Sequence, residues 1–175
     1  MVFFASLAGV GAKALGAPPN VELLMPFVVA AGLARGPGYG FAAGFAIRGA
    51  YDVYLGWAGP WTIMTTLAYG LTGALIGLVG HYWRVRTRGE ITLAAGCAAL
   101  FYDVVTMLVG WALFPMPFVV LVVGQVPFSV NHAASSMLFC FVLVPSIVRV
   151  LRSFTEKSRN AVSVAAPTYL QQKSK

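Results

Sequence analysis

Four of the ionisable residues that interrupt the apolar runs of this 175-residue chain are its first candidates for chemistry. Arg48 and Asp52 stand four residues apart, a spacing at which two helical side chains can form an ion pair. Asp103 lies within a second apolar run with no basic residue beside it, and His132 follows Asn131 in a third. Because a charge at the centre of a bilayer costs at least about 2.5–3.5 kcal/mol on insertion scales, each is a site hypothesis.

Each of these residues also has a purely structural interpretation. The Arg48–Asp52 pair can neutralise itself and only support the fold. Asp103 either pairs across a helix bundle with Arg48 or faces a wet pocket. Asn131 and His132 either bind a ligand or form hydrogen bonds between helices. No second His, Cys or carboxylate stands at ligand spacing on the same helix, so we expect no metal site.

Three tryptophans, Trp57, Trp61 and Trp111, fall at the ends of apolar runs. An aromatic belt at the membrane interface would place them there in any case. Pockets for small molecules, however, are mostly apolar and aromatic, with a few polar groups that orient the ligand. The sequence therefore predicts an outward-facing pocket with these candidate substrate-binding residues: Arg48, Asp52, Trp57, Trp61, Asp103, Trp111, Asn131 and His132.

No catalytic motif accompanies the candidate pocket. The sequence has no nucleophile elbow, no phosphate-binding glycine-rich loop and no helix with metal-ligand His and Glu spacing. We therefore expect neither an enzyme nor a cofactor. Active transport by such a chain would need ATP hydrolysis on a partner subunit, or an ion gradient.

The composition indicates the environment in which these residues work. With 59% hydrophobic residues and a mean hydropathy of +0.80, the chain has too little polar sequence to cover a soluble globule. Its net charge of +7 comes from basic residues at the ends of apolar runs, which indicates membrane topology and not nucleic-acid binding. The predicted class is an all-α, multi-pass protein of the cell (plasma) membrane.

Six candidate membrane spans follow when the chain is divided at its Gly/Pro and charge clusters. They cover residues 2–17, 20–35, 37–56, 60–82, 91–113 and about 126–149. The apolar segment 114–127 is bracketed by prolines and too brief to cross, which favours a separate surface or re-entrant helix. We expect one domain over residues 1–152 and a disordered basic cytoplasmic tail over 153–175.

The distribution of Lys and Arg predicts the orientation. With both termini in the cytoplasm, the inner segments are 35–37, 83–90 and the tail from residue 149, and they hold ten of the twelve basic residues. Cytoplasmic loops retain such residues during insertion. The prediction is a six-helix transmembrane bundle with both termini cytoplasmic.

Small residues line one side of the first span. Ala8, Ala12 and Gly16 recur at four-residue spacing, which lets another helix backbone approach closely. Thr, Gly and Tyr residues form a comparable stripe on the span over 60–82, where packing inside the bundle is the favoured interpretation. The face on the first span serves either internal packing or a partner protein.

Three stretches together resemble the substrate-binding S component of energy-coupling factor (ECF) vitamin transporters. They are "PPNVELLMPFVVAAGLARGPGYGFAAGFAI" (18–47), "GWAGPWTIMTTLAYGLTGALIGLVG" (56–80) and "FSVNHAASSMLFCFVLVPSIVRVLR" (128–152). The resemblance implies a six-helix bundle that takes up a vitamin or related micronutrient from outside. It also implies docking of the first helix, through Ala8 and Ala12, onto a transmembrane coupling protein powered by two ATPase subunits.

Two other classes of function stay open at this point. A stand-alone secondary transporter or facilitator would use Asp103 in proton coupling. A structural or assembly protein of the membrane would bind no ligand. The residues leave the identity of the substrate undetermined, although aromatics with two aspartates suit a flat heterocycle with donor groups.

Overall fold

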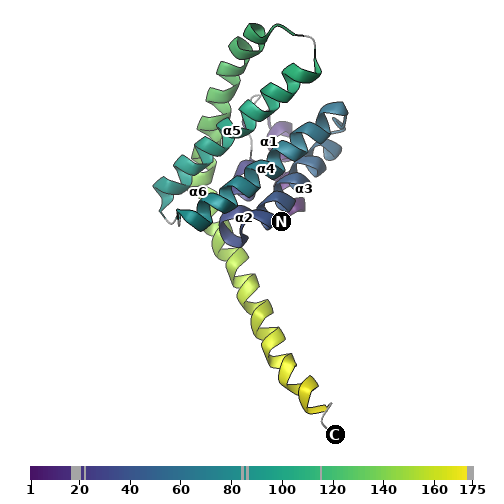
Figure 1. Ribbon diagram of the computed structural model, residues 1–175, viewed down its shortest axis with the longest axis vertical. Helices are drawn as coiled ribbons and strands as arrows, with labels where there is room; N and C mark the ends of the chain where they lie inside the picture. Colours follow the sequence, from purple (N-terminus) through teal and green to yellow (C-terminus); the bar gives the residue numbers. More distant parts are fainter. Residues whose placement is uncertain (17–20, 22, 84, 86, 115, 173–175) are drawn as a thin grey trace.

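The computed structural model describes residues 1–16, 21, 23–83, 85, 87–114 and 116–172, with side chains as far as residue 157. Its elements are six helices, and the described residues contain no strand: α1 (Val2–Ala14), α2 (Met25–Arg35), α3 (Pro37–Tyr54), α4 (Pro60–Tyr82), α5 (Arg88–Leu113) and α6 (Phe118–Gln172). The first five helices and the first part of α6 pack into a bundle, and the rest of α6 extends away from it (Figure 1). The all-α prediction is confirmed.

Glycine and proline set the junctions between α2, α3 and α4. Gly36 follows α2 with a φ of 85°, a left-handed conformation that glycine adopts without strain, and Pro37 then opens α3. Pro60 opens α4, where the amide of Gly59 donates to Oγ1 of Thr62 over 2.9 Å. These breaks place the carboxyl end of α3 next to the amino end of α4.

A side-chain cap starts α5 three residues earlier than the sequence indicated. The amide of Glu90 donates to Oγ1 of Thr87 (3.2 Å), and the amide of Thr87 donates to Oε2 of Glu90 (2.8 Å). This reciprocal capping box satisfies two backbone donors that would otherwise lack partners. The helix therefore begins at Arg88 instead of residue 91.

The separate helix predicted within 114–127 is wrong. α5 ends at Leu113, and α6 is helical from Phe118 onward without interruption. A proline inside a helix removes one backbone hydrogen bond, but membrane helices tolerate it where neighbouring groups satisfy the freed carbonyl, and α6 keeps Pro127 inside a continuous helix. The predicted division of the chain at residue 152 stays a prediction, although α6 runs across that position to Gln172.

Glycines let α3 and α4 lie in very close contact. A methyl group added at Gly40 would collide with the carbonyl of Gly73, and one added at Gly44 would collide with the carbonyl of Tyr69. At Gly77, an added methyl would lie 2.5 Å from the backbone of Pro37. The prediction that the small-residue stripe on α4 serves internal packing is confirmed, and this close packing fixes the register of the polar residues on both helices.

Within the described residues, three helices are long and apolar enough to cross a membrane: α4, α5 and the Phe118–Lys157 part of α6. The apolar helices α1 and α2 have 13 and 11 residues. At 1.5 Å per residue they rise about 16–20 Å, which is less than the roughly 30 Å hydrocarbon core. The fold is thus that of a helical membrane bundle, with three of the six expected spans of membrane length.

Candidate functional site: a buried polar and aromatic network

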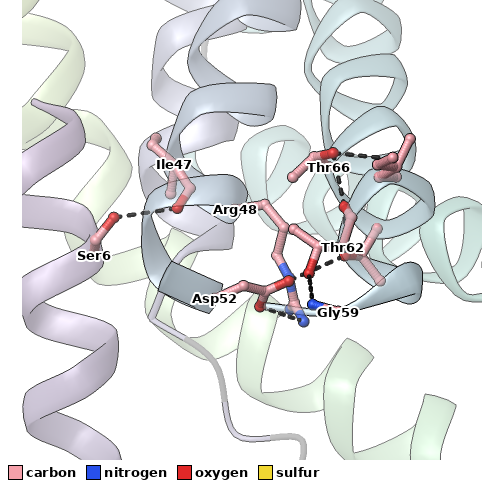
Figure 2. A network of polar contacts seen from close by, with 9 residues as sticks. Ser6, Ile47, Arg48, Asp52, Gly59, Thr62 and Thr66 are labelled. Carbon is pink, nitrogen blue, oxygen red and sulfur yellow. Dashed lines mark hydrogen bonds and ion pairs between the residues drawn. The ribbon is translucent and has the colours of Figure 1, made fainter. Parts of the chain in front are cut away.

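Asp52 is 1% exposed and is held from two helices. Its Oδ1 atom lies 3.1 Å from Nη2 of Arg48, one turn earlier on α3. Oγ1 of Thr65 on α4 donates to its Oδ2 atom over 3.4 Å. Figure 2 shows the pair facing the amino end of α4, where the hydrogen bond between Gly59 and Thr62 caps the first turn of the helix. The intrahelical ion pair predicted from the spacing is present, and it compensates the burial of the carboxylate.

Arg48 links this ion pair to the aromatic interior of the bundle. Its guanidinium carbon lies 5.5 Å from the ring centroid of Tyr51 and 5.7 Å from that of Tyr69 on α4. Both distances fall within the range of about 6 Å in which a cation is attracted to an aromatic face. Tyr69 is fully buried, so this contact takes place inside the bundle.

The aromatic contacts continue from α4 to α5 and α6. The rings of Tyr69 and Tyr102 meet edge to face with centroids 4.7 Å apart. Tyr102 meets the His132 ring in the same way at 5.6 Å, and Phe128 contacts His132 from one turn earlier on α6 at 5.9 Å. Such geometry is the favoured one for aromatic pairs.

Asp103 pairs with His132 across the α5–α6 interface. Nδ1 of His132 lies 2.8 Å from Oδ1 of Asp103, and the two side chains are 2% and 1% exposed. An ionised carboxylate only accepts hydrogen bonds, and in that state Nδ1 carries the hydrogen. Of the two interpretations of Asp103, the pairing with Arg48 is not what the structure shows, because Arg48 pairs with Asp52, and the wet pocket stays a prediction. Of the two interpretations of His132, the interhelical hydrogen bond is present.

These contacts form one continuous system across four helices, which we call the buried network: Arg48, Asp52, Tyr69, Tyr102, Asp103 and His132. Two buried oxygens, Oδ2 of Asp103 in the network and Oγ of Ser136 one turn after His132, have no hydrogen-bond partner among the residues that the structure describes. A buried acceptor without a partner costs about 1–3 kcal/mol. A ligand donor or a water molecule that reached these atoms would remove that cost.

The remaining pocket candidates lie outside the buried network. Trp57, Trp61 and Trp111 are 55%, 46% and 48% exposed, and Asn131 is also exposed although His132 beside it is buried. Trp111 packs edge to face on Phe118 with centroids 5.2 Å apart. Trp57 follows α3, Trp61 lies at the start of α4, and Trp111 lies near the end of α5. The orientation prediction assigns all three of these helix ends to the outside. Their role in binding stays a prediction.

Sequence reasoning missed three members of the site: Tyr69, Tyr102 and Thr65. In the sequence, Tyr69 falls among the Thr, Gly and Tyr residues of the span over 60–82, and Tyr102 stands next to Asp103. The available signal was position, since Tyr69 lies four residues after Thr65, on the same helix face. That both residues face Asp52 and Arg48 depends on the close α3–α4 packing, which spacing within one helix does not reveal.

One side of α1 packs against the bundle, and the rest of its surface is partly or fully exposed. Ala5, Ser6 and Gly9 are buried, and the Ser6 hydroxyl donates to the carbonyl of Ile47 on α3 over 3.1 Å. Ala8 and Ala12 are half-buried, and Gly16 is exposed with a φ of 81°. The face predicted for partner docking is thus next to the packed face and partly open. No group of three or more His, Cys, Asp or Glu residues in the described part of the chain could hold a metal ion.

Comparison with known proteins identifies the family. The family model for the "ECF-type riboflavin transporter, S component" matches residues 4–149, which include the whole buried network. Searches of curated proteins and of solved structures gave no significant match. The match spans most of the chain and bears out the resemblance noted in the sequence. The chain therefore belongs to the family of ECF-type riboflavin transporter S components and is the substrate-binding subunit of a vitamin importer, a transport protein and not an enzyme.

Proposed function

We propose that this S component binds riboflavin, or a flat heterocyclic vitamin of the same shape, beside the buried network. The observation that carries the proposal is the carboxylate of Asp103, which is buried in the bundle with Oδ2 lacking a partner in the described part of the chain. A fused heterocycle with ring N–H groups offers donors for such an acceptor, and its flat face suits aromatic side chains. The family description, which names riboflavin, supports this choice.

Within this proposal the site residues divide by position. Asp103 and His132 orient the polar edge of the ring, and Arg48 with Asp52 forms the second polar group of the same network. Trp57, Trp61, Trp111 and Asn131, exposed at the ends of the helices, cover the bound vitamin from the outer side. Binding energy then comes from the burial of the aromatic surface, and orientation comes from a small number of polar contacts.

Mass spectrometry of small molecules that remain bound to the purified protein tests this function without assuming the ligand. We expect one flavin or similar heterocycle in the wild-type sample and its loss from an Asp103→Asn variant. An exposed carboxylate variant, Glu156→Gln, is the matched control and should keep the compound. A wild-type sample without any retained heterocycle, or identical profiles for the Asp103→Asn and wild-type samples, would contradict the proposal.

We further propose that the six helices cross the cell membrane with both termini in the cytoplasm. Basic residues at the ends assigned to the inside support this orientation. The test uses single cysteines at Ala58 and Gly89, in a background with Cys97 and Cys140 replaced by alanine. A membrane-impermeant thiol reagent applied to intact cells should label position 58 and not position 89. The reverse pattern would contradict the orientation.

Docking onto a transmembrane coupling protein with two ATPase subunits is proposed for the open part of α1. Ala8 and Ala12 leave a shallow surface because a methyl side chain lets a partner helix approach closely, and Gly16 extends it. Ala8→Leu should abolish co-purification with the coupling protein and ATPases while vitamin binding remains. Ala14→Leu, on the exposed opposite side of α1, should leave co-purification intact. Equal co-purification of both variants would contradict this docking surface.

A further inference from the structure

A cavity lies at the end of the bundle away from Trp57 and Trp61. It has a volume of about 640 Å³ and is lined by residues of α2, α4, α5, α6 and the α4–α5 connection. This volume falls within the roughly 300–1,000 Å³ of small-molecule sites. A neighbouring cavity of about 390 Å³ shares four of its lining residues, so the two form one hollow along α6.

Three arginines give this hollow its charge: Arg88, Arg149 and Arg152. An Nη of Arg88 donates to the carbonyl of Phe141 (3.3 Å), and an Nη of Arg152 donates to the carbonyl of Leu33 (3.4 Å). Each guanidinium has five N–H donors, so most of them stay available after these bonds. Among the described residues none of the three arginines forms an ion pair with a carboxylate.

The rest of the lining is apolar, with Leu33, Val85, Ile91 and Val148 on the walls of the larger cavity. Among the described lining residues of both cavities the one carboxylate is that of Glu156, which lines the smaller cavity beside Arg149 and Arg152. A cavity with clustered guanidinium groups and apolar walls matches a ligand that joins a phosphate to a hydrocarbon chain. A small soluble anion would use the arginines alone and leave the apolar walls unoccupied.

We propose that this hollow is a site for the phosphate group of an anionic phospholipid of the cytoplasmic leaflet. The arginines bind the phosphate, and the apolar walls hold the first part of an acyl chain. This site is separate from the vitamin site, since none of its lining residues belongs to the buried network. A bound lipid would hold residues 145–152 of α6 against α2 and α5 in membranes that contain anionic lipid.

The test measures lipid binding by native mass spectrometry of the protein in detergent. Arg149 is the residue to change, because its side chain makes no hydrogen bond or ion pair with the described residues and its loss should leave the fold intact. Wild-type protein should bind phosphatidylglycerol about fivefold or more tightly than phosphatidylcholine with the same chains. Arg149→Gln should remove most of this preference, and Arg149→Lys should restore part of it.

Lys157→Gln is the matched control, because it removes one exposed positive charge from the same helix outside both cavities. It should keep the preference for phosphatidylglycerol. Inorganic phosphate, added as a competitor, distinguishes a lipid site from a site for free phosphate. Weak competition supports the lipid, whereas complete displacement at low millimolar phosphate overturns it in favour of a soluble ligand. Equal binding of the two lipids, or a preference that survives Arg149→Gln, overturns the site.

Discussion

Replacing Asp103 by Asn is the change that bears most directly on the buried network. The variant keeps the shape of the side chain, removes its charge and turns one of its two acceptor oxygens into a donor. A hydrogen bond to a charged group contributes about 1.5–3 kcal/mol. If the ligand donates to the buried Oδ2 atom as proposed, the loss of this bond should weaken riboflavin binding about 10- to 100-fold, at about 1.4 kcal/mol per factor of ten.

Quenching of riboflavin fluorescence during titration with the purified protein measures this loss. Thermal unfolding in the same detergent, followed by circular dichroism, shows whether the variant is folded. Glu156→Gln removes an exposed carboxylate of α6 and should bind riboflavin as the wild type does. Ser136→Ala removes the other buried oxygen without a described partner and should cost less, about three- to tenfold, because a neutral hydroxyl makes weaker bonds.

The reasoning is refuted if folded Asp103→Asn binds riboflavin with wild-type affinity. In that case the carboxylate serves only the pair with His132, and Oδ2 does not face the ligand. If Asp103→Asn fails to fold, Ser136→Ala decides the matter, since a small hydroxyl is removed there without disturbing an ion pair. Unchanged affinity in Ser136→Ala would then contradict a ligand at this position.

Three further predictions concern the fold that holds the network. Gly73→Ala should lower the thermal midpoint by several degrees, because the added methyl collides with the backbone of Gly40 and overpacking costs about 1–3 kcal/mol. Gly11→Ala is the control, because its added methyl meets no atom within 4 Å and should not lower the midpoint. Equal midpoints for the two variants would contradict the close α3–α4 contact. Arg48→Met leaves Asp52 buried without its cation and should lower the free energy of unfolding by about 3–5 kcal/mol. The double variant Arg48→Met with Asp52→Leu should recover much of this loss. A single variant as stable as the wild type would show that the pair is dispensable. Thr87→Ala removes the α5 cap and should cost about 1 kcal/mol in the same unfolding assay, whereas no change would mean that other contacts start the helix.

Helix positions followed from the sequence where proline, glycine and charge mark the boundaries. The span over 60–82 coincides with α4 because Pro60 starts it and a segment rich in arginine, residues 84–88, follows shortly after Tyr82. The predicted start at residue 91 was late, since the Thr87–Glu90 capping box lies outside the apolar run. The prolines that bracket 114–127 indicate a separate short helix, whereas the structure accommodates Pro127 within one continuous helix from Phe118.

The candidate site was predictable in part, according to how local each contact is. The Arg48–Asp52 pair follows from a spacing of four on one helix. The Asp103–His132 pair joins residues 29 positions apart on two helices, and no pattern within either helix specifies it. The burial of Tyr69 depends on the glycines of α3 that admit α4 so closely. To predict a contact between two helices, the rotation of each helix about its own axis must be known. A helix that is apolar on nearly every face does not reveal this rotation.

An experimental structure of the protein with riboflavin bound tests the central claim most directly. The account predicts one riboflavin molecule beside the buried network, with a ring nitrogen or hydroxyl donor within about 3.2 Å of Oδ2 of Asp103. Riboflavin bound at the arginine-lined end of the bundle, or at the outer end without contact to Asp103 or Ser136, would contradict it.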